Sequence, residues 1–190
     1  MQEPIRILRE EHDNILRGLE LLEACSDKLR DGCEVSPKTM EDLIEFFRLY
    51  ADKTHHGKEE DLLFPAMIEH GFSREEGPIH CMLADHEHNR SLTREMIAAT
   101  ESYRGGDKKA GLRFAKAACE YVRALREHIQ KENLVLFVMA DNTLPVEDEP
   151  ELLARFQEVD GKKIGAAEIG RLLRILEKVG GEVGMVEKLV

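Results

Sequence analysis

Four long segments of the chain carry apolar residues at alternating steps of three and four. This spacing places those residues on one face of an α-helix. The segments span about residues 4–30, 37–70, 77–102 and 107–141. Because the connections between them are short, neighbouring helices should be antiparallel. The pattern therefore predicts an all-α fold, an up-down-up-down four-helix bundle over residues 1–145 whose four apolar faces share one axis.

Turn and capping residues support these boundaries. Ser36-Pro37 is a strong helix start, with serine as the N-cap and proline at the first helical position. Asp107 is placed to cap the fourth segment. Pro65 lies inside the second segment and should kink that helix or end its first part. In the fourth segment the step continues past residue 132, which predicts that Val135 and Met139 also face the interior.

Each predicted helix has a histidine in its apolar face, and two helices add a glutamate: His12, His55, His86, His128, Glu59 and Glu132. Burying a carboxylate without a partner costs several kcal/mol. Two carboxylates among four imidazoles at a bundle centre therefore indicate a bound cation. Bundle cores hold dinuclear iron or manganese with such side chains. The combination of imidazole and carboxylate favours iron over calcium or magnesium, with other transition metals as alternatives.

The choice between two adjacent His-Glu pairs rests on an internal repeat. Stretches starting at His55 and His128 both read His-x-x-Lys-Glu-x-x-x-Leu-Phe. On a helix, the histidine and the glutamate four residues later lie on one face. Aligning the stretches selects His55 with Glu59, because pairing His56 with Glu60 would lose the other matches. The other four histidines, including His56, are expected at the surface or as partners of the ligands.

A metal-free alternative has to be weighed against this interpretation. The chain contains three His-x-x-x-Glu pairs, whereas ordinary glutamate usage gives about one by chance. The pair count alone therefore does not decide between a metal site and a structural or interaction bundle without metal. A metal-free bundle would give no reason for histidines and glutamates in the apolar faces of the helices, and this favours the metal site.

Composition excludes several classes of function. The net charge of −11 argues against a nucleic-acid partner, which requires a basic face. No stretch approaches the roughly 20 apolar residues of a membrane span. The start of the chain has no recognisable signal peptide, and the four cysteines lack the spacing of a metal or redox motif. We therefore expect a cytoplasmic protein with reduced thiols. The oligomeric state stays open.

Four motifs occur together in the chain: Glu11-His12, His55-x-x-Lys58-Glu59-Glu60-x-x-Leu63-Phe64-Pro65, Gly77-Pro78-Ile79-x-x-Met82-x-x-Asp85-His86-Glu87 and His128-x-x-Lys131-Glu132. In these motifs the chain resembles the hemerythrin-like proteins of the HHE cation-binding family, over about residues 5–142. The resemblance implies a four-helix bundle with a non-haem diiron centre. It also implies that Glu59 and Glu132 bridge two iron ions, while His12, His55, His86 and His128 supply terminal nitrogens.

The chain also departs from the oxygen-carrying hemerythrins. Those proteins use five histidines, two of them as His-x-x-x-His on the third helix, and an aspartate on the fourth. Here Arg90 follows four residues after His86, and Glu132 is on the fourth helix. The set of four histidines and two glutamates is similar to the diiron domain of iron–sulfur-cluster repair proteins.

The resemblance therefore implies a protein that binds, senses or reacts with a small ligand, namely oxygen, nitric oxide or peroxide. A redox partner is a further expectation. The alternative is a diiron enzyme or repair factor in iron or nitrosative stress.

Residues 146–190 form a less patterned extension. Short helices are expected near residues 150–159 and 166–179, packed on the bundle or on a partner. The extension contains no histidine, so we assign it no chemistry. One hypothesis is that the helix at 166–179 covers one end of the bundle and limits access to the metal site.

Overall fold

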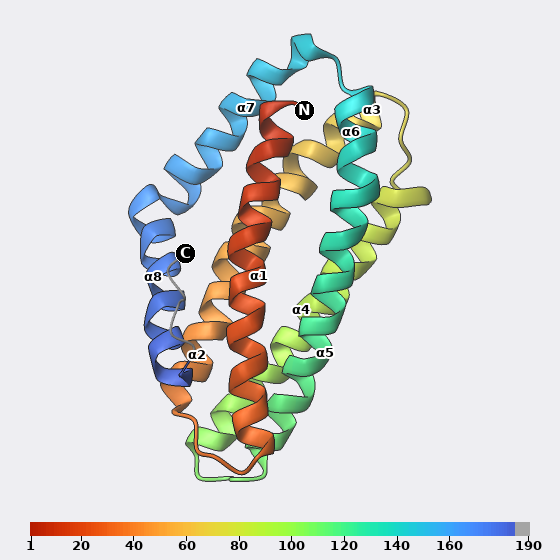
Figure 1. Cartoon of the computed structure of the whole chain (residues 1–190). Helices are drawn as coiled ribbons and strands as arrows, with labels where there is room; N and C mark the ends of the chain where they lie inside the picture. Colours follow the sequence, from red (N-terminus) through yellow and green to blue (C-terminus); the bar gives the residue numbers. More distant parts are fainter. Residues whose placement is uncertain (185–190) are drawn as a thin grey trace.

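A computed structural model of the chain describes residues 1–184, and every regular element in that range is helical (Figure 1). The α-helices are α1 (Glu3–Arg30), α2 (Pro37–Phe46), α3 (Phe64–Glu69), α4 (Gly77–Arg104), α5 (Ala110–Lys131), α6 (Phe137–Thr143), α7 (Glu149–Glu158) and α8 (Ala166–Val183). Four π-helical segments and one 3-10 turn connect them: η1 (Phe47–His56), η2 (Glu59–Leu63), η3 (Glu132–Leu136), η5 (Val159–Ile164) and the 3-10 turn η4 (Val146–Asp148). No helix among the described residues is long and apolar enough to cross a membrane.

The long elements form the predicted four-helix bundle. Its second arm runs from α2 through η1 and η2 to α3, and its fourth arm from α5 through η3 to α6 (Figure 1). Helix α1 contacts both α2 and α5, and α4 contacts the same two helices, which closes the ring of four arms. The all-α prediction with additional C-terminal helices is confirmed.

The capping residues explain where the arms begin. The Ser36 side chain accepts a hydrogen bond from the Thr39 N–H at 3.0 Å, as predicted for the start of α2. The Asp107 carboxylate accepts one from the Lys109 N–H at 3.0 Å, just before α5. Pro65 lies inside the second arm, just after the junction of η2 and α3, where the helical hydrogen-bond pattern changes from π to α.

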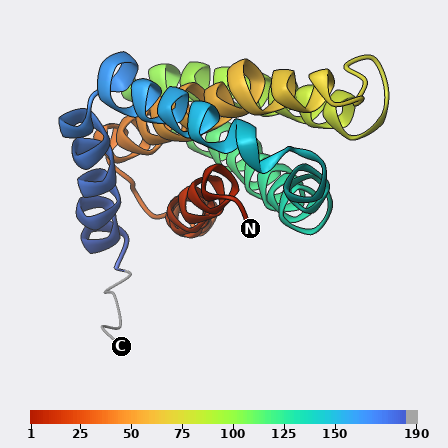
Figure 2. The same cartoon turned by 90° about the horizontal axis from the view of Figure 1, so that it is seen from above.

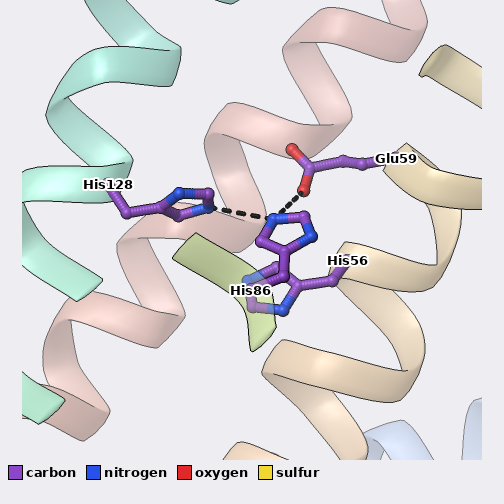
Figure 3. A group of neighbouring side chains, drawn as sticks. All are labelled: His56, Glu59, His86 and His128. Atoms are coloured by element: carbon purple, nitrogen blue, oxygen red, sulfur yellow. Dashed lines mark hydrogen bonds and ion pairs between the residues drawn. The ribbon is translucent and has the colours of Figure 1, made fainter. Parts of the chain in front are cut away.

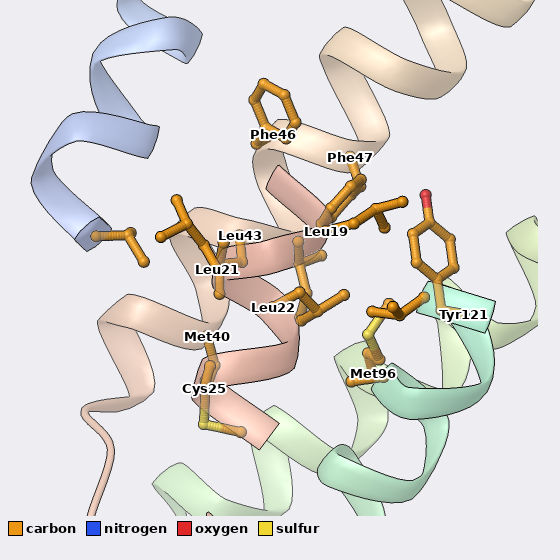
Figure 4. Packing of buried hydrophobic residues seen from close by; sticks show 14 of the residues in the cluster. Leu19, Leu21, Leu22, Cys25, Met40, Leu43, Phe46, Phe47, Met96 and Tyr121 are labelled. Atoms are coloured by element: carbon orange, nitrogen blue, oxygen red, sulfur yellow. The ribbon is translucent and has the colours of Figure 1, made fainter. Parts of the chain in front are cut away.

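Two apolar clusters fill the bundle. The lower cluster lies toward the loops at the bottom of Figure 1 and includes Leu19, Leu22, Phe47 and Met96 (Figure 4). The upper cluster is made by the other ends of the arms: Ile5, Leu8, Phe64, Met82 and Phe137. A fully buried leucine or phenylalanine contributes about 1.5–3 kcal/mol relative to an exposed one, so these clusters provide most of the stability.

Helices α1 and α2 approach each other closely at Gly18. A Cβ atom at this position would lie 2.6 Å from Cε1 of Phe46 and 3.2 Å from Cζ of Phe47. Both rings are buried, so they have little room to move aside. The close packing of the two helices therefore requires glycine here, although glycine is less favourable than alanine inside a helix.

The π-helical segments change the register of the apolar face. In a π-helix each N–H bonds to the carbonyl five residues earlier, so a turn contains an extra residue. After Glu132 the predicted interior positions Val135 and Met139 are 50% and 37% exposed, whereas Leu136 and Ala140 are buried. The prediction for Val135 and Met139 is therefore wrong. It assumed a regular α-helix through η3.

The C-terminal extension covers the bundle with two different parts. Helix α8 packs on α1 and α2, and its residues Leu172 and Leu176 belong to the lower cluster. Helix α7 packs on α1 and η2, and its Phe156 belongs to the upper cluster. Figure 2 shows α7 lying across the gap between α1 and the second arm. The part of the extension nearer the predicted site is thus α7 with η5 rather than the helix at 166–179.

Candidate metal centre

All six residues predicted as ligands converge on one polar region between the two apolar clusters. They come from all four arms of the bundle, and each is at most 1% exposed: His12, His55, Glu59, His86, His128 and Glu132. Their burial follows from the apolar face that each arm presents to the axis. The structure thus brings together residues that the sequence could place only on separate helices.

Each of the two carboxylates faces histidines on two sides. Glu59 has Oε1 at 3.6 Å from Nε2 of His55 and Oε2 at 3.4 Å from Nε2 of His86. Glu132 has Oε2 at 3.1 Å from Nε2 of His12 and Oε1 at 3.2 Å from Nε2 of His128. Both glutamates therefore extend from a His12–His55 side of the region to a His86–His128 side. Glu59 belongs to both groups of neighbouring donor atoms in this region, one with His12, His55 and Glu132 and the other with His56, His86 and His128.

The histidine nitrogens and carboxylate oxygens that face one another are better suited to binding a cation than to hydrogen-bonding with one another. Nε2 of His86 lies 3.1 Å from Nε2 of His128, so two atoms that are both acceptors in the metal-binding tautomer point at each other. All four carboxylate oxygens of Glu59 and Glu132 are buried without a hydrogen-bond partner. Buried polar atoms are rarely left unpaired. The donor set of imidazoles and carboxylates suits a transition metal such as iron.

The outer nitrogens of the histidines are held by a ring of partners. Nδ1 of His55 lies 2.9 Å from Glu11, and Nδ1 of His86 lies 2.6 Å from Glu60. With Nδ1–H donating outward, each Nε2 lone pair faces the centre, the arrangement usual for metal-bound histidines.

The other two histidines complete the ring. Nδ1 of His128 lies 3.3 Å from Asp85, and Nδ1 of His12 lies 3.1 Å from Oδ1 of Asn133. Every partner is on an arm other than that of its histidine. The four imidazoles are therefore oriented from outside before any metal binds.

Burial and mutual repulsion set the charges in this region. Burial lowers the pKa of His55 and of His86 well below the usual histidine value, and neighbouring imidazoles lower it further. Burial also raises the pKa of Glu59 well above its usual value, and Glu132 adds to this. Burial also acts to lower the pKa of His128, but the Glu132 carboxylate outweighs burial and raises this pKa to about 9. A cation would favour ionised Glu59 and neutral imidazoles, the forms that bind metal.

His56 does not lie at the surface, one of the two positions expected for it, because it is only 2% exposed. Its burial beside a proposed ligand fits the other expectation, that it is a partner of the ligands. Its ring stacks on that of His86, with the centroids 3.9 Å apart and the planes 16° from parallel (Figure 3). One of its ring nitrogens lies within 4.8 Å of donor atoms of Glu59, His86 and His128.

Lys58 forms a buried link between the centre and the C-terminal extension. The side chain is 0% exposed, and its ammonium pairs with Glu11, the residue behind His55. The same ammonium lies 2.6 Å from Asp160 of η5 and 5.7 Å from the ring centroid of Phe156. The extension thus completes the surroundings of the His55 partner.

A small polar cavity lies beside the centre. It has a volume of about 200 Å³ and lies between the second arm and α4, with the rings of His56 and His86 among its walls. Asn89 also lines it, and neither side-chain atom of this buried residue has a hydrogen-bond partner. Tyr121 of α5 lines the cavity as well. The cavity therefore meets the centre from the side of His56.

A comparison with protein families gives one match. The family described as hemerythrin, "Hemerythrin HHE cation binding domain", matches residues 3–140. This range contains all six predicted ligands and ends before α7. No curated protein and no solved structure matches the chain significantly.

Proposed function

The chain belongs to the hemerythrin HHE cation-binding family, and on that premise we propose that it is a non-haem diiron protein. Its centre would bind, sense or react with a small ligand such as oxygen, nitric oxide or peroxide. The observation that carries the proposal is the placement of Glu59 and Glu132. Each carboxylate faces a histidine on both sides of one buried region, and none of the four oxygens has a hydrogen-bond partner.

The proposed ligands fall into two groups that share the carboxylates. His12 and His55 would hold one iron and His86 and His128 the other, and Glu59 and Glu132, which face both pairs, would be ligands to both. Iron bound in this way supplies the capacity to coordinate a small molecule and to exchange electrons. The chain's own contribution is to orient the imidazoles from outside and to exclude bulk water.

Burial supports a small ligand over a larger substrate. The six side chains are at most 1% exposed, and apolar clusters close the region above and below. The cavity beside His56 and His86 has a volume of about 200 Å³, which suits a small molecule. Diatomic molecules and peroxide meet this limit.

The test is metal analysis coupled to optical spectroscopy. We expect the protein, after iron reconstitution, to hold about two irons per chain, as a dinuclear bundle site requires. The reduced protein should change its spectrum when oxygen, nitric oxide or peroxide is added. A protein that stays metal-free after reconstitution would overturn the proposal and favour a structural bundle.

Two histidine variants make this test specific. His128→Gln removes a proposed ligand, and we expect loss of iron and of the spectral change. His80→Gln removes an exposed histidine from the same fold and should leave both unchanged. Equal iron content in the two variants would contradict the assignment of His128. Repeated additions of peroxide then separate reversible binding from catalytic consumption, the activity expected of an enzyme or repair factor.

A further inference from the structure

Three of the carboxylates that hold the proposed ligands from outside are each paired with a cation: Glu11 with Lys58, Glu60 with Arg90, and Asp85 with Lys131. The Arg90 and Lys131 side chains are 31% and 47% exposed, so water screens their charges. The Lys58 side chain is fully buried. A charge kept away from water acts more strongly on its neighbours. Lys58 is therefore the cation of the three with the strongest effect on the carboxylate beside it.

Lys58 joins two carboxylates, and one of them lies outside the four-helix bundle. Oε2 of Glu11 lies 2.9 Å from Nδ1 of His55, while Oε1 of Glu11 accepts a hydrogen bond from the Lys58 ammonium. The same ammonium lies 2.6 Å from Oδ1 of Asp160 in η5. A chain of paired groups therefore runs from a proposed ligand to the C-terminal extension. Asp160 is also beyond residue 140, where the match to the family ends.

Attachment of the extension does not by itself explain a charged residue at position 58. Phe156 of α7 is fully buried in the upper cluster and already docks this part of the extension by apolar contact. Burying an ammonium between carboxylates carries a desolvation cost, and apolar replacements of buried ion pairs are often neutral or stabilising. The reason for the charge therefore lies in the group it acts on. That group is Glu11, the partner of His55.

We propose that Asp160 is a positioning residue for the proposed ligand His55. It acts through Lys58 and Glu11. An ammonium that is shared with Asp160 draws less on Glu11, which then accepts more strongly from the Nδ1–H of His55. A stronger acceptor at this position makes the imidazole more basic toward a metal. The inference rests on the proposed diiron function, and it makes the C-terminal extension a part of the metal centre's surroundings that tunes its reduction potential.

The first test uses the full chain without iron. Nuclear magnetic resonance detects the Nδ1–H proton of His55, whose signal moves upfield when its hydrogen bond weakens. We expect Asp160→Asn to move this signal upfield, because Glu11 is then drawn more strongly to Lys58. The matched control is Asp148→Asn, which removes an exposed carboxylate of the same extension, 2.9 Å from His70. It should leave the His55 signal in place. An unchanged His55 signal in a folded Asp160→Asn protein would overturn the proposal.

The second test measures the reduction potentials of the iron-loaded protein. Asp160→Asn should raise the potential of one iron, because a less basic imidazole and the loss of a negative charge both disfavour oxidised iron. Asp160→Glu keeps the carboxylate and should return the potential toward that of the wild type. Asp148→Asn should not change it.

A double-mutant cycle tests the route through Lys58. In a Lys58→Met background the link to Glu11 is already broken, so Asp160→Asn should change the reduction potential by less than it does in the wild type. An equal or larger change in that background would contradict the route through Lys58.

The proposed function and this inference fail in different ways. A chain that binds no iron but shows the shift of the His55 signal would overturn the diiron function and keep the link from Asp160 to His55. A chain that binds two irons but shows neither the shift nor the change in potential would keep the diiron function and overturn the role of Asp160.

Discussion

At the scale of single residues, the partners behind the histidines follow a rule. Each is the sequence neighbour of a proposed ligand on a different arm. Glu11 precedes His12 but holds His55, and Glu60 follows Glu59 but holds His86. In the same way Asp85 next to His86 holds His128, and Asn133 next to Glu132 holds His12. The four arms thus orient one another's ligands around a closed ring.

Glu59→Leu should stabilise the iron-free protein while abolishing iron binding. The carboxylate of Glu59 is fully buried without a hydrogen-bond partner, and burial raises its pKa. Replacing it by an apolar group removes a desolvation cost of about 1–3 kcal/mol. We expect a higher Tm for the iron-free variant than for the iron-free wild type. A lower Tm would indicate that Glu59 has a structural role apart from metal.

The sequence located the six convergent residues but only some of what surrounds them. A histidine in an apolar face can be recognised from helical spacing alone, as His12 and His86 were. The partner of each histidine depends on the rotation and height of a different helix, which spacing does not contain. The sequence repeat favours His55 over its neighbour His56, and a strict α-helical step places adjacent residues about 100° apart. The π-helical winding of η1 lets both face the interior.

At the scale of elements, the π-helical segments coincide with the proposed ligands. Segment η1 ends with His55 and His56, η2 begins at Glu59, and η3 begins at Glu132. Such segments are less stable than α-helix and are frequent at functional sites. Their extra residue per turn also changes which later residues face the interior. The sequence thus predicted the helix boundaries and caps well. It did not predict which residues face the interior beyond Glu132, because of this extra residue.

Gly18→Ala and Gly181→Ala form a matched pair of helix substitutions. Alanine stabilises a helix interior by about 1 kcal/mol relative to glycine. A methyl group added at Gly181 would have no atom within 4 Å, so that variant should gain stability. At Gly18 the new methyl would overlap Phe46, and overpacking of this kind costs about 1–3 kcal/mol. Urea unfolding should therefore show opposite changes. A gain in both would mean that α1 and α2 adjust freely.

At the scale of the whole molecule, the extension is attached to the bundle by charge as well as by apolar contacts. Asp42 of α2 is buried, and its carboxylate accepts hydrogen bonds from Lys38 at 2.5 Å and from Lys178 of α8 at 2.7 Å. Burial acts to raise the pKa of Asp42, but the two ammonium groups outweigh it and hold the pKa below its usual value. The ionised form of Asp42 therefore stabilises the docked α8.

The contribution of Asp42 should depend on pH in a defined direction. Its folded pKa is lowered, so its stabilisation is present above the ordinary value near 3.8 and is lost as the pH falls through the lower folded value. We expect Asp42→Asn to cost about 1–3 kcal/mol at pH 7 and progressively less as the pH falls below 3.8. The exposed Glu34→Gln variant should change little over the same range. A pH-independent difference for Asp42→Asn would contradict this account.

The partners of the buried Lys58 are synthesised at very different times. A chain is made from its amino end, so Glu11 and Lys58 are present long before Asp160 and Phe156. By the time Glu132 has been added, all six proposed ligands exist, but the Lys58 ammonium still lacks its second carboxylate and its aromatic cover. The growing protein therefore contains all six proposed ligands before the residues that cover Lys58 are added.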